Sequence, residues 1–177
     1  MGWQFKQGEA LLVLDMLNDF IDEKGSLLVP GASRIVPRIR ELIESARAAG
    51  VPVIYVCDTH RPDDKEFEHW PPHGVEDSWG GQVVDGLKPL PTEHIVHKRR
   101  YSAFFGTDLE LTLSEMGVHR VLLAGVLTNI CVWVTAYDAS MRNFDVTVFR
   151  DAVASFSEET DRFVLSQLEQ VMQADIV

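Results

Sequence analysis

Short apolar runs alternate along the chain with longer stretches in which apolar side chains recur at helical spacing. The runs predict strands at residues 10–14, 53–56, 94–97, 121–124 and 146–149, and the start of an edge strand at residues 176–177. The first run, Ala-Leu-Leu-Val-Leu, has no polar position. Such a run is typical of a parallel strand that is buried on both faces.

Helical periodicity predicts the connecting elements, at residues 35–49, about 107–117, 129–142 and 158–173. Their expected N-caps are Ser33, Thr107 and Ser157. Thr107 and Glu110 have the spacing of a capping box, and Gly50 and Gly117 are expected to end two helices. The alternation of strand and helix predicts one α/β domain over residues 1–177, a doubly wound, mostly parallel sheet with helices on both faces.

The connection over residues 59–93 has no clear periodicity. It contains five of the eight prolines of the chain, which are Pro62, Pro71, Pro72, Pro89 and Pro91. A connection of this length inside a compact domain is usually functional. We therefore expect part of the functional site to lie in it.

Composition and charge narrow the class of protein. The 177 residues are 46% hydrophobic and 24% charged, which is ordinary for a globular chain. The net charge of −11 disfavours a nucleic-acid or anionic-membrane partner, since both bind basic surfaces. Two cysteines do not make a disulfide framework, and the polar N-terminal segment lacks the apolar stretch of a signal peptide. We predict a soluble, cytoplasmic protein.

Polar side chains follow successive predicted strands, at the points where the carboxyl ends of those strands should meet. In chain order they are Asp15, Asp58, His60, Lys98 and Cys131. In an open parallel sheet this edge is where ligands bind. Taken singly, each residue has an ordinary structural explanation, such as a turn-forming aspartate, a solvated lysine or a core cysteine. Their joint placement favours a functional site.

Cys131, Asp15 and Lys98 can supply nucleophile chemistry without a histidine base. A thiol is mostly protonated near neutral pH, and the thiolate is the nucleophile. We expect Lys98 and the positive end of the helix around residue 130 to lower the pKa of Cys131. Asp15 can accept the thiol proton and return it to a leaving amine. The neighbouring Arg99 and Arg100 are expected to face solvent.

A second cluster lies in the long connection. Asp58 and His60 are followed there by Glu66, Trp70 and His73. A carboxylate and imidazoles at this spacing suit a first-row divalent metal with an open coordination position. Trp70 and the adjacent prolines would stiffen the loop and wall a pocket. The alternative is a polar surface loop that binds no metal.

Three segments resemble the signatures of the isochorismatase-like cysteine hydrolases. They are residues 14–20 (LDMLNDF), 98–104 (KRRYSAF) and 125–131 (GVLTNIC). The resemblance continues to Ser155, and it implies a six-stranded parallel sheet and a catalytic triad of Asp15, Lys98 and Cys131. It also implies a cis peptide bond before Leu127, which directs the backbone N–H groups of Leu127 and Cys131 as an oxyanion hole.

Within that superfamily, the loop cluster resembles the nicotinamidase/pyrazinamidase branch. The resemblance implies that Asp58, His60 and His73 bind one divalent metal ion, commonly zinc, with manganese or iron as alternatives. Glu66 is a candidate fourth ligand, and the ion would hold the pyridine nitrogen of nicotinamide. The residues implied to contact the substrate are Phe20, Trp70 and Tyr101. A homo-oligomer is also expected.

The leading hypothesis is a cysteine-dependent amidohydrolase that converts nicotinamide to nicotinate and ammonia through a thioester on Cys131. One alternative is a metal-free relative that acts on a ureido, carbamoyl or other small amide, and bound metal would discriminate the two. Another alternative is a non-catalytic protein that binds a small molecule, which selective labelling of Cys131 would test. A dinucleotide-binding fold is disfavoured because no G-x-G-x-x-G motif follows the first strand.

Overall fold

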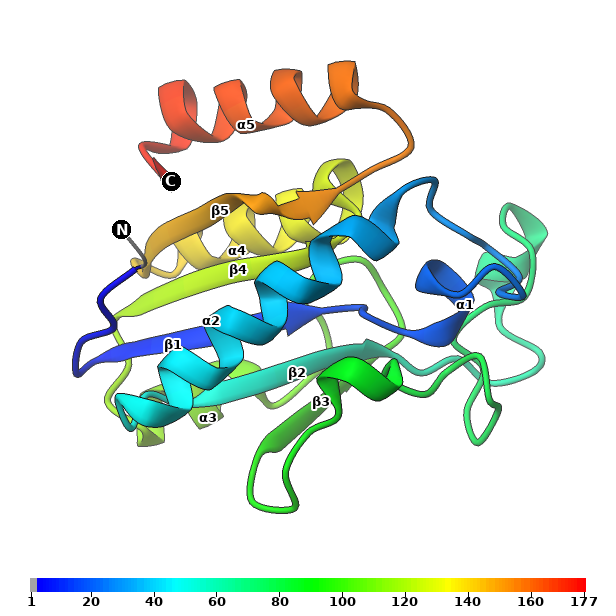
Figure 1. Cartoon of the computed structure of the whole chain (residues 1–177), viewed down its shortest axis with the longest axis horizontal. Helices are drawn as coiled ribbons and strands as arrows, with labels where there is room; N and C mark the ends of the chain where they lie inside the picture. Colours follow the sequence, from blue (N-terminus) through cyan, green and yellow to red (C-terminus); the bar gives the residue numbers. More distant parts are fainter. Residues whose placement is uncertain (1–2) are drawn as a thin grey trace.

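The apolar runs form one six-stranded sheet in the computed structural model, which describes residues 3–177 (Figure 1). The strands are β1 Glu9–Leu14, β2 Val53–Asp58, β3 His94–Lys98, β4 Arg120–Val126, β5 Asp145–Ala154 and β6 Asp175–Ile176. All neighbouring strands are parallel, and their order is β3-β2-β1-β4-β5-β6. The predicted α/β fold with a parallel sheet is confirmed.

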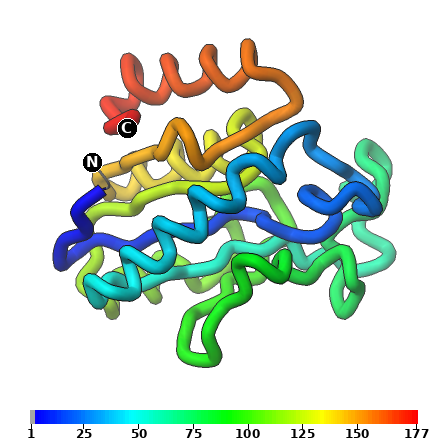
Figure 2. The backbone as a smooth tube through the Cα atoms, viewed as in Figure 1, coloured from blue at the N-terminus to red at the C-terminus, as the bar shows by residue number. Residues whose placement is uncertain are grey.

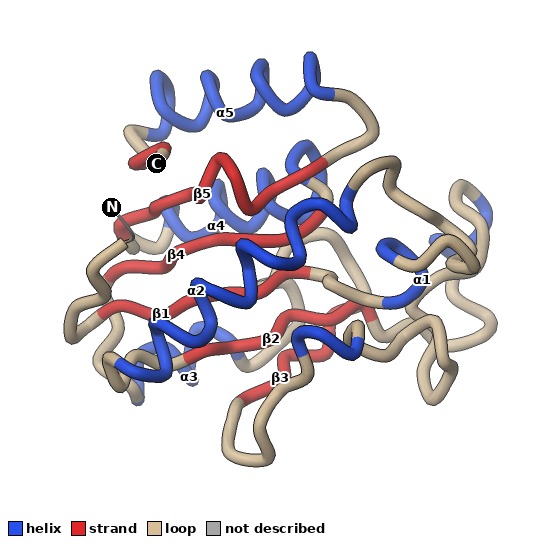
Figure 3. The backbone as a smooth tube through the Cα atoms, in the orientation of Figure 1, coloured by secondary structure: helices blue, strands red, loops and turns tan. Residues whose placement is uncertain are grey.

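Helices and tighter turns connect the strands (Figure 3). The α-helices are α1 Asn18–Ile21, α2 Val36–Ala48, α3 Leu109–Glu115, α4 Trp133–Met141 and α5 Glu158–Met172. Short 3-10 turns cover Ala32–Ile35, Lys65–Glu68 and Asp85–Leu87, and a π turn covers Thr128–Val132 directly before α4. In the part of the chain that the structure describes, no helix is both long and apolar enough to cross a membrane.

Each face of the sheet has its own apolar core. The tube in Figure 2 shows α2 running across one face of the sheet. On one face, α2 packs Ile39 and Leu42 against strand residues that include Leu11. On the other face, residues of α3, α4 and α5 pack against strand residues that include Leu12. Consecutive side chains of a strand point to opposite faces, so neighbours in β1 belong to different cores. This is why the strands are unbroken apolar runs in the sequence.

The strand order reverses between β1 and β4, which are neighbours in the sheet although β2 and β3 lie between them in the sequence. Their pairing ends at Leu14 and Gly125. Gly125 has a φ of 124°, and a Cβ there would collide with the carbonyl oxygen of Leu14, so only glycine fits. Doubly wound sheets bind ligands where the order reverses. Asp15 follows β1 and Cys131 follows β4, so both lie at this switch point.

Two of the three predicted helix caps are wrong. Ser157 caps α5 as expected, because its Oγ accepts a hydrogen bond from the Thr160 N–H at 3.2 Å. Ser33 does not cap α2, since a 3-10 turn already encloses it. The capping box is also absent: Thr107 lies one residue before the N-cap of α3, and Glu110 pairs with the arginine that follows α4.

Strand β5 is longer than predicted. The apolar run at residues 146–149 continues through exposed Arg150 and Asp151 to Ala154, and a register shift against β4 accommodates the irregularity. These two charged residues interrupt the apolar pattern, so the sequence marks only the first half of the strand. The edge strand β6 begins at Asp175, one residue earlier than expected.

Candidate active site

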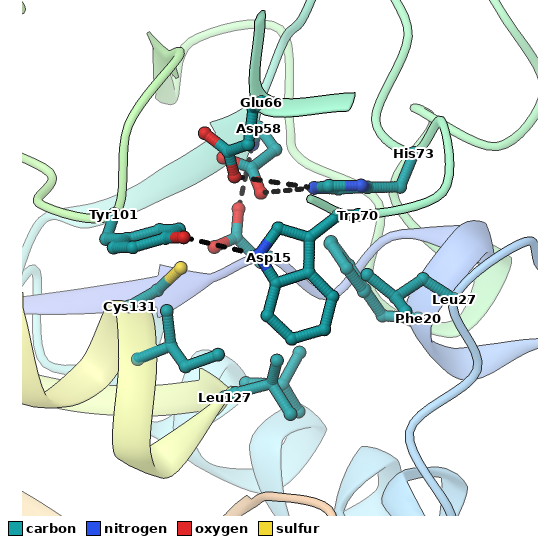
Figure 4. A pocket seen from close by; sticks show the side chains of 12 residues that line it. Asp15, Phe20, Leu27, Asp58, Glu66, Trp70, His73, Tyr101, Leu127 and Cys131 are labelled. Carbon is teal, nitrogen blue, oxygen red and sulfur yellow. Dashed lines mark hydrogen bonds and ion pairs between the residues drawn. The ribbon is translucent and has the colours of Figure 1, made fainter. Parts of the chain in front are cut away.

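A pocket at the switch point collects most of the predicted site residues (Figure 4). Its empty volume is about 330 Å³, part of which is open to solvent. The residues that line it are Asp15, Phe20, Leu27, Asp58, Glu66, Trp70, His73, Tyr101, Val126, Leu127, Ile130 and Cys131. His60 and Lys98 lie behind this lining, with side chains that are fully buried. Strand ends and the long connection therefore build one site, as predicted from the sheet topology.

Lys98 lies at the centre of a buried cluster of charges. Its Nζ is 2.9 Å from Asp15 Oδ2, 2.5 Å from Asp58 Oδ1 and 3.4 Å from Cys131 Sγ. The sheet register explains the placement, since Asp58 and Lys98 are partners at the ends of β2 and β3. Burial lowers the pKa of Lys98, but the two carboxylates outweigh it and raise that pKa well above its ordinary value. Lys98 is therefore a fixed cation beside the thiol.

Asp15 is oriented by its own backbone and by β2. Its φ of 50° lies in the left-handed region, which aspartate tolerates better than most residues. Its Oδ1 accepts a hydrogen bond from the Asp58 N–H at 2.8 Å, which leaves Oδ2 to Lys98. Burial and the Asp58 carboxylate raise the pKa of Asp15 to about 6, against the opposing charge of Lys98. A carboxyl group with this pKa can take up and release a proton near neutral pH.

Cys131 lies in the π turn that leads from β4 into α4. The thiol is buried, and Sγ lies within 4.8 Å of carboxylate oxygens of Asp15 and Asp58. Burial raises the pKa of Cys131 well above its ordinary value, and the charge of Lys98 offsets only part of this effect. Lys98 does act to lower the thiol pKa, as predicted, but the expected net lowering is wrong, because burial first and then the carboxylates of Asp15 and Asp58 raise that pKa by more. The resting group is a thiol with a proton acceptor beside it.

A cis peptide bond joins Val126 and Leu127, as the resemblance implies. The carbonyl oxygen of Leu127 accepts hydrogen bonds from the N–H groups of Ile130 and Val132, at 3.0 and 3.1 Å. These bonds fix the turn that carries Cys131. Leu127 and Cys131 both line the pocket, which is compatible with the predicted oxyanion hole. That role of their backbone N–H groups remains a prediction.

Asp58, His60 and His73 form a buried group, called here the metal group, with one candidate ligand atom of each within 4.8 Å of the others. Asp58 Oδ1 is 3.7 Å from His60 Nε2, and Asp58 Oδ2 is 3.8 Å from His73 Nε2. Glu66 Oε1 is 3.9 Å from the same nitrogen of His73. Ligands bound to one zinc ion at about 2.1 Å lie roughly 3–3.5 Å apart, so the observed spacing is close to what an ion requires.

Hydrogen bonding also suits the two histidines to a metal ion. His73 Nδ1 lies 2.7 Å from the carbonyl oxygen of Pro71, an arrangement that needs a proton on Nδ1 and leaves a lone pair on Nε2. His60 is fully buried, and within residues 3–177 neither of its ring nitrogens forms a hydrogen bond. A buried polar atom without a partner is costly, and an ion at Nε2 would remove that cost. The residues present therefore fit a divalent metal.

Arg99 and Arg100 do not simply face solvent, as the sequence suggested. Their side chains are 50% and 44% exposed, but their guanidinium groups lie 2.7 Å and 3.1 Å from the buried carboxylate of Asp64. The sequence pattern does not point to Asp64. The signal that could have found it is its position four residues after His60, in the loop that supplies the metal group.

Aromatic side chains form the outer wall of the pocket. The Phe20 and His73 rings have centroids 5.4 Å apart. Trp70 Nε1 donates a hydrogen bond to the Tyr101 hydroxyl at 3.2 Å, and its indole stacks on Phe156, with centroids 6.3 Å apart. The three predicted substrate contacts, Phe20, Trp70 and Tyr101, thus line one pocket. The sequence pattern does not point to Phe156, which supports Trp70, or to three apolar residues of the lining, which are Leu27, Val126 and Ile130.

Comparison with known proteins decides the family. The sequence matches the Isochorismatase domain over residues 9–176. The chain belongs to the isochorismatase family. A relative from Arabidopsis thaliana, described as a probable inactive nicotinamidase, is 35% identical over 161 residues, which cover 85% of this chain and 82% of the relative.

Solved structures of isochorismatase-family proteins share the fold. PncA from Bacillus subtilis, a nicotinamidase/pyrazinamidase, is similar with a TM-score of 0.91 and 34% identity, over 96% of this chain and 98% of that one. The pyrazinamidase of Pyrococcus horikoshii in complex with zinc gives 0.90 and 33%, over 96% and 98%. An N-carbamoylsarcosine amidase from Thermoplasma acidophilum gives 0.87 and 37%, over 95% and 94%. The relatives therefore include more than one kind of amidase.

Replacing Lys98 with methionine is expected to slow alkylation of Cys131 in this isochorismatase-family protein. Lys98 is the main group that lowers the thiol pKa, so its loss reduces the thiolate fraction near neutral pH, by about tenfold per pKa unit. Iodoacetamide labelling over a pH series, read by peptide mass spectrometry, measures the rate. The control is Lys88→Met, which removes a surface lysine 2.6 Å from Asp85. Equal rates in Lys98→Met and wild type would contradict the role of Lys98.

Proposed function

We propose that this isochorismatase-family amidohydrolase is a nicotinamidase, which converts nicotinamide and water to nicotinate and ammonia. The observation that carries the proposal is the buried metal group of Asp58, His60 and His73 beside the thiol of Cys131. His73 and Cys131 line the same pocket, and aromatic rings wall it. A planar heteroaromatic amide could therefore contact the metal group through its ring and the thiol through its carboxamide.

In the first half-reaction, Sγ of Cys131 bonds to the amide carbon while the thiol proton passes to the Asp15 carboxylate. The backbone N–H groups of Leu127 and Cys131 stabilise the negative charge that develops on the amide oxygen. Asp15, now a carboxylic acid, gives its proton to the amide nitrogen, and the C–N bond breaks to release ammonia. A thioester on Cys131 remains. The pKa of about 6 suits Asp15 to both transfers.

In the second half-reaction, a water molecule bonds to the thioester carbon and gives one proton to Asp15. The C–S bond then breaks, and the Cys131 thiolate takes that proton back from Asp15. Nicotinic acid leaves and ionises to nicotinate. Lys98 keeps its charge throughout, so it stabilises the Asp15 carboxylate and the thiolate when each is present.

The metal group and the aromatic wall would set the specificity. When bound, a divalent ion, which we take to be zinc with manganese or iron as alternatives, supplies a Lewis-acid position for the pyridine nitrogen. Glu66 is a candidate fourth ligand because it lies 3.9 Å from His73 Nε2. Phe20 and Trp70 would contact the ring, and Tyr101 would hold Trp70 through their hydrogen bond.

Ammonia release from three amides tests this assignment. Nicotinamide and pyrazinamide both have a ring nitrogen at the required position, whereas benzamide has the same carboxamide and no ring nitrogen. We expect kcat/KM for benzamide to be lower by at least about 100-fold, since a site built for a polar group rejects the analogue that lacks it. Equal turnover of all three amides would contradict the proposal.

One observation favours a metal-free amidase as the second candidate. Asp58 Oδ1 lies 2.5 Å from Lys98 Nζ, so one oxygen of the metal group already contacts a cation. Burial acts to raise the pKa of Asp58, but Lys98 outweighs it and the pKa is lowered to about 2. If Asp58 serves only to hold Lys98, no metal is needed, which leaves the second candidate: a metal-free amidase for a ureido, carbamoyl or other small amide. Full activity in metal-free protein would favour this second candidate.

A further inference from the structure

Asp64 lies directly behind His60, on the opposite side of the ring from the metal group. Asp64 Oδ2 is 3.2 Å from His60 Nδ1, whereas His60 Nε2 faces Asp58 at 3.7 Å. The side chains of Asp64 and His60 are both 0% exposed. Within residues 3–177 this Nδ1 forms no hydrogen bond, and the Asp64 carboxylate is the group within ion-pair distance of it. A buried carboxylate is thus the available partner for one ring nitrogen, and the metal group faces the other.

Two arginines bind Asp64 and fix its position. Arg99 Nε and Nη2 lie 2.8 Å and 2.7 Å from Oδ2, and Arg100 Nη1 lies 3.1 Å from Oδ1. Arginine stays charged at all ordinary pH values, so this pair compensates the buried carboxylate. The arrangement explains why two exposed arginines directly follow Lys98: they reach across to the loop that carries His60.

We propose that Asp64 is a positioning residue for the metal group, an inference that rests on the metal centre of the proposed function. Asp64 would accept the Nδ1 proton of His60 and so fix the tautomer whose Nε2 lone pair faces Asp58. Carboxylates behind metal-bound histidines orient the ring and increase the basicity of the ligand nitrogen, and their loss typically weakens metal binding. The carbonyl oxygen of Pro71 has the equivalent place behind His73.

Asp64 also has a structural role that the experiment must separate. Its Oδ1 accepts the Glu66 N–H at 3.1 Å and caps the Lys65–Glu68 turn. Serine and asparagine are good caps, so both substitutions preserve the turn. The serine hydroxyl is too short to reach His60, whereas the asparagine carbonyl occupies nearly the same place as the aspartate oxygen. Alanine removes both the cap and the contact.

The test measures Zn(II) affinity by competition with a chromophoric chelator, and the melting temperature of the same proteins in excess chelator. We expect Asp64→Ser to lower the affinity about 10- to 100-fold, while its metal-free melting temperature falls no further than that of Asp64→Asn, since both variants lose the ion pairs with Arg99 and Arg100 and both keep the cap. Asp64→Asn should recover part of the affinity, and Asp64→Ala should lose both affinity and stability. The matched control is Asp63→Ser, since Asp63 is exposed and pairs with Arg61.

Wild-type Zn(II) affinity in Asp64→Ser would overturn the positioning role. So would a loss of affinity confined to Asp64→Ala that follows its lower melting temperature, because Asp64 would then act only as a cap. A wild-type protein that binds no Zn(II) would overturn the proposed metal centre and this inference together. The Zn(II) measurement uses no amide substrate. Its outcome is therefore independent of whether the protein hydrolyses nicotinamide.

Discussion

Cys131→Ala is expected to fold as the wild type does and to lose at least about 1,000-fold in ammonia release from nicotinamide. The reaction proposed here has no other nucleophile, and removing the nucleophile of a hydrolase costs several orders of magnitude. The fold should survive because alanine is small and the ion pairs of Lys98 with Asp15 and Asp58 do not involve sulfur. A coupled ammonia assay and thermal unfolding measure the two effects.

Cys57→Ala is the matched control for this experiment. Cys57 is the other free cysteine and is equally buried, but it lies in β2 and does not line the pocket. We expect it to keep wild-type activity. Residual activity above a few per cent in Cys131→Ala would rule out a thioester on Cys131. An inactive wild-type protein with intact thiols would instead support a non-catalytic binding protein.

The strands could be predicted because burial on both faces leaves a simple mark in the sequence. Every residue of β1 is buried, and its apolar run begins at Ala10. The second half of β5 could not be predicted, because Arg150 and Asp151 are exposed at an irregularity that depends on the pairing with β4. The prediction that Ser33 caps α2 was wrong because it, too, depended on local geometry that the sequence pattern does not show. The chain tightens there into a 3-10 turn, and its apolar residues join the core beneath α2.

The members of the site could be predicted, but not their electrostatics. Strand ends at a switch point must converge, so the sequence alone predicts that Asp15, Lys98 and Cys131 lie together. The thiol pKa depends on the burial of Cys131 and on the number of carboxylates near Lys98. Neither can be read from the residues next to Cys131 in the sequence. Asp64 was missed because its role depends on a contact with His60 inside an irregular loop. The catalytic and metal-binding roles stay predictions, as do the single domain, the homo-oligomer and the cytoplasmic location.

His60→Ala is expected to lose bound metal and nicotinamide hydrolysis together. His60 Nε2 is one of three candidate ligand atoms that lie within 4.8 Å of one another, and removing one leaves too few for a stable site. Zn(II) at 100 times its Kd should stabilise the wild type by about 2.7 kcal/mol, because the ion binds the folded state. The variant should show no such shift. Metal content by mass spectrometry and melting temperatures with and without Zn(II) measure these effects.

The melting temperature of each protein with Zn(II) is compared with that of its own metal-free form. The destabilisation caused by the cavity that His60→Ala leaves therefore cancels in the comparison. His69→Ala is the control, since His69 is exposed in the same loop and has no match to the family ligands. It should bind Zn(II) and hydrolyse nicotinamide as the wild type does. Retention of metal by His60→Ala would remove His60 from the metal group. Retention of full activity without metal would instead favour the metal-free amidase, in which Asp58 serves to hold Lys98.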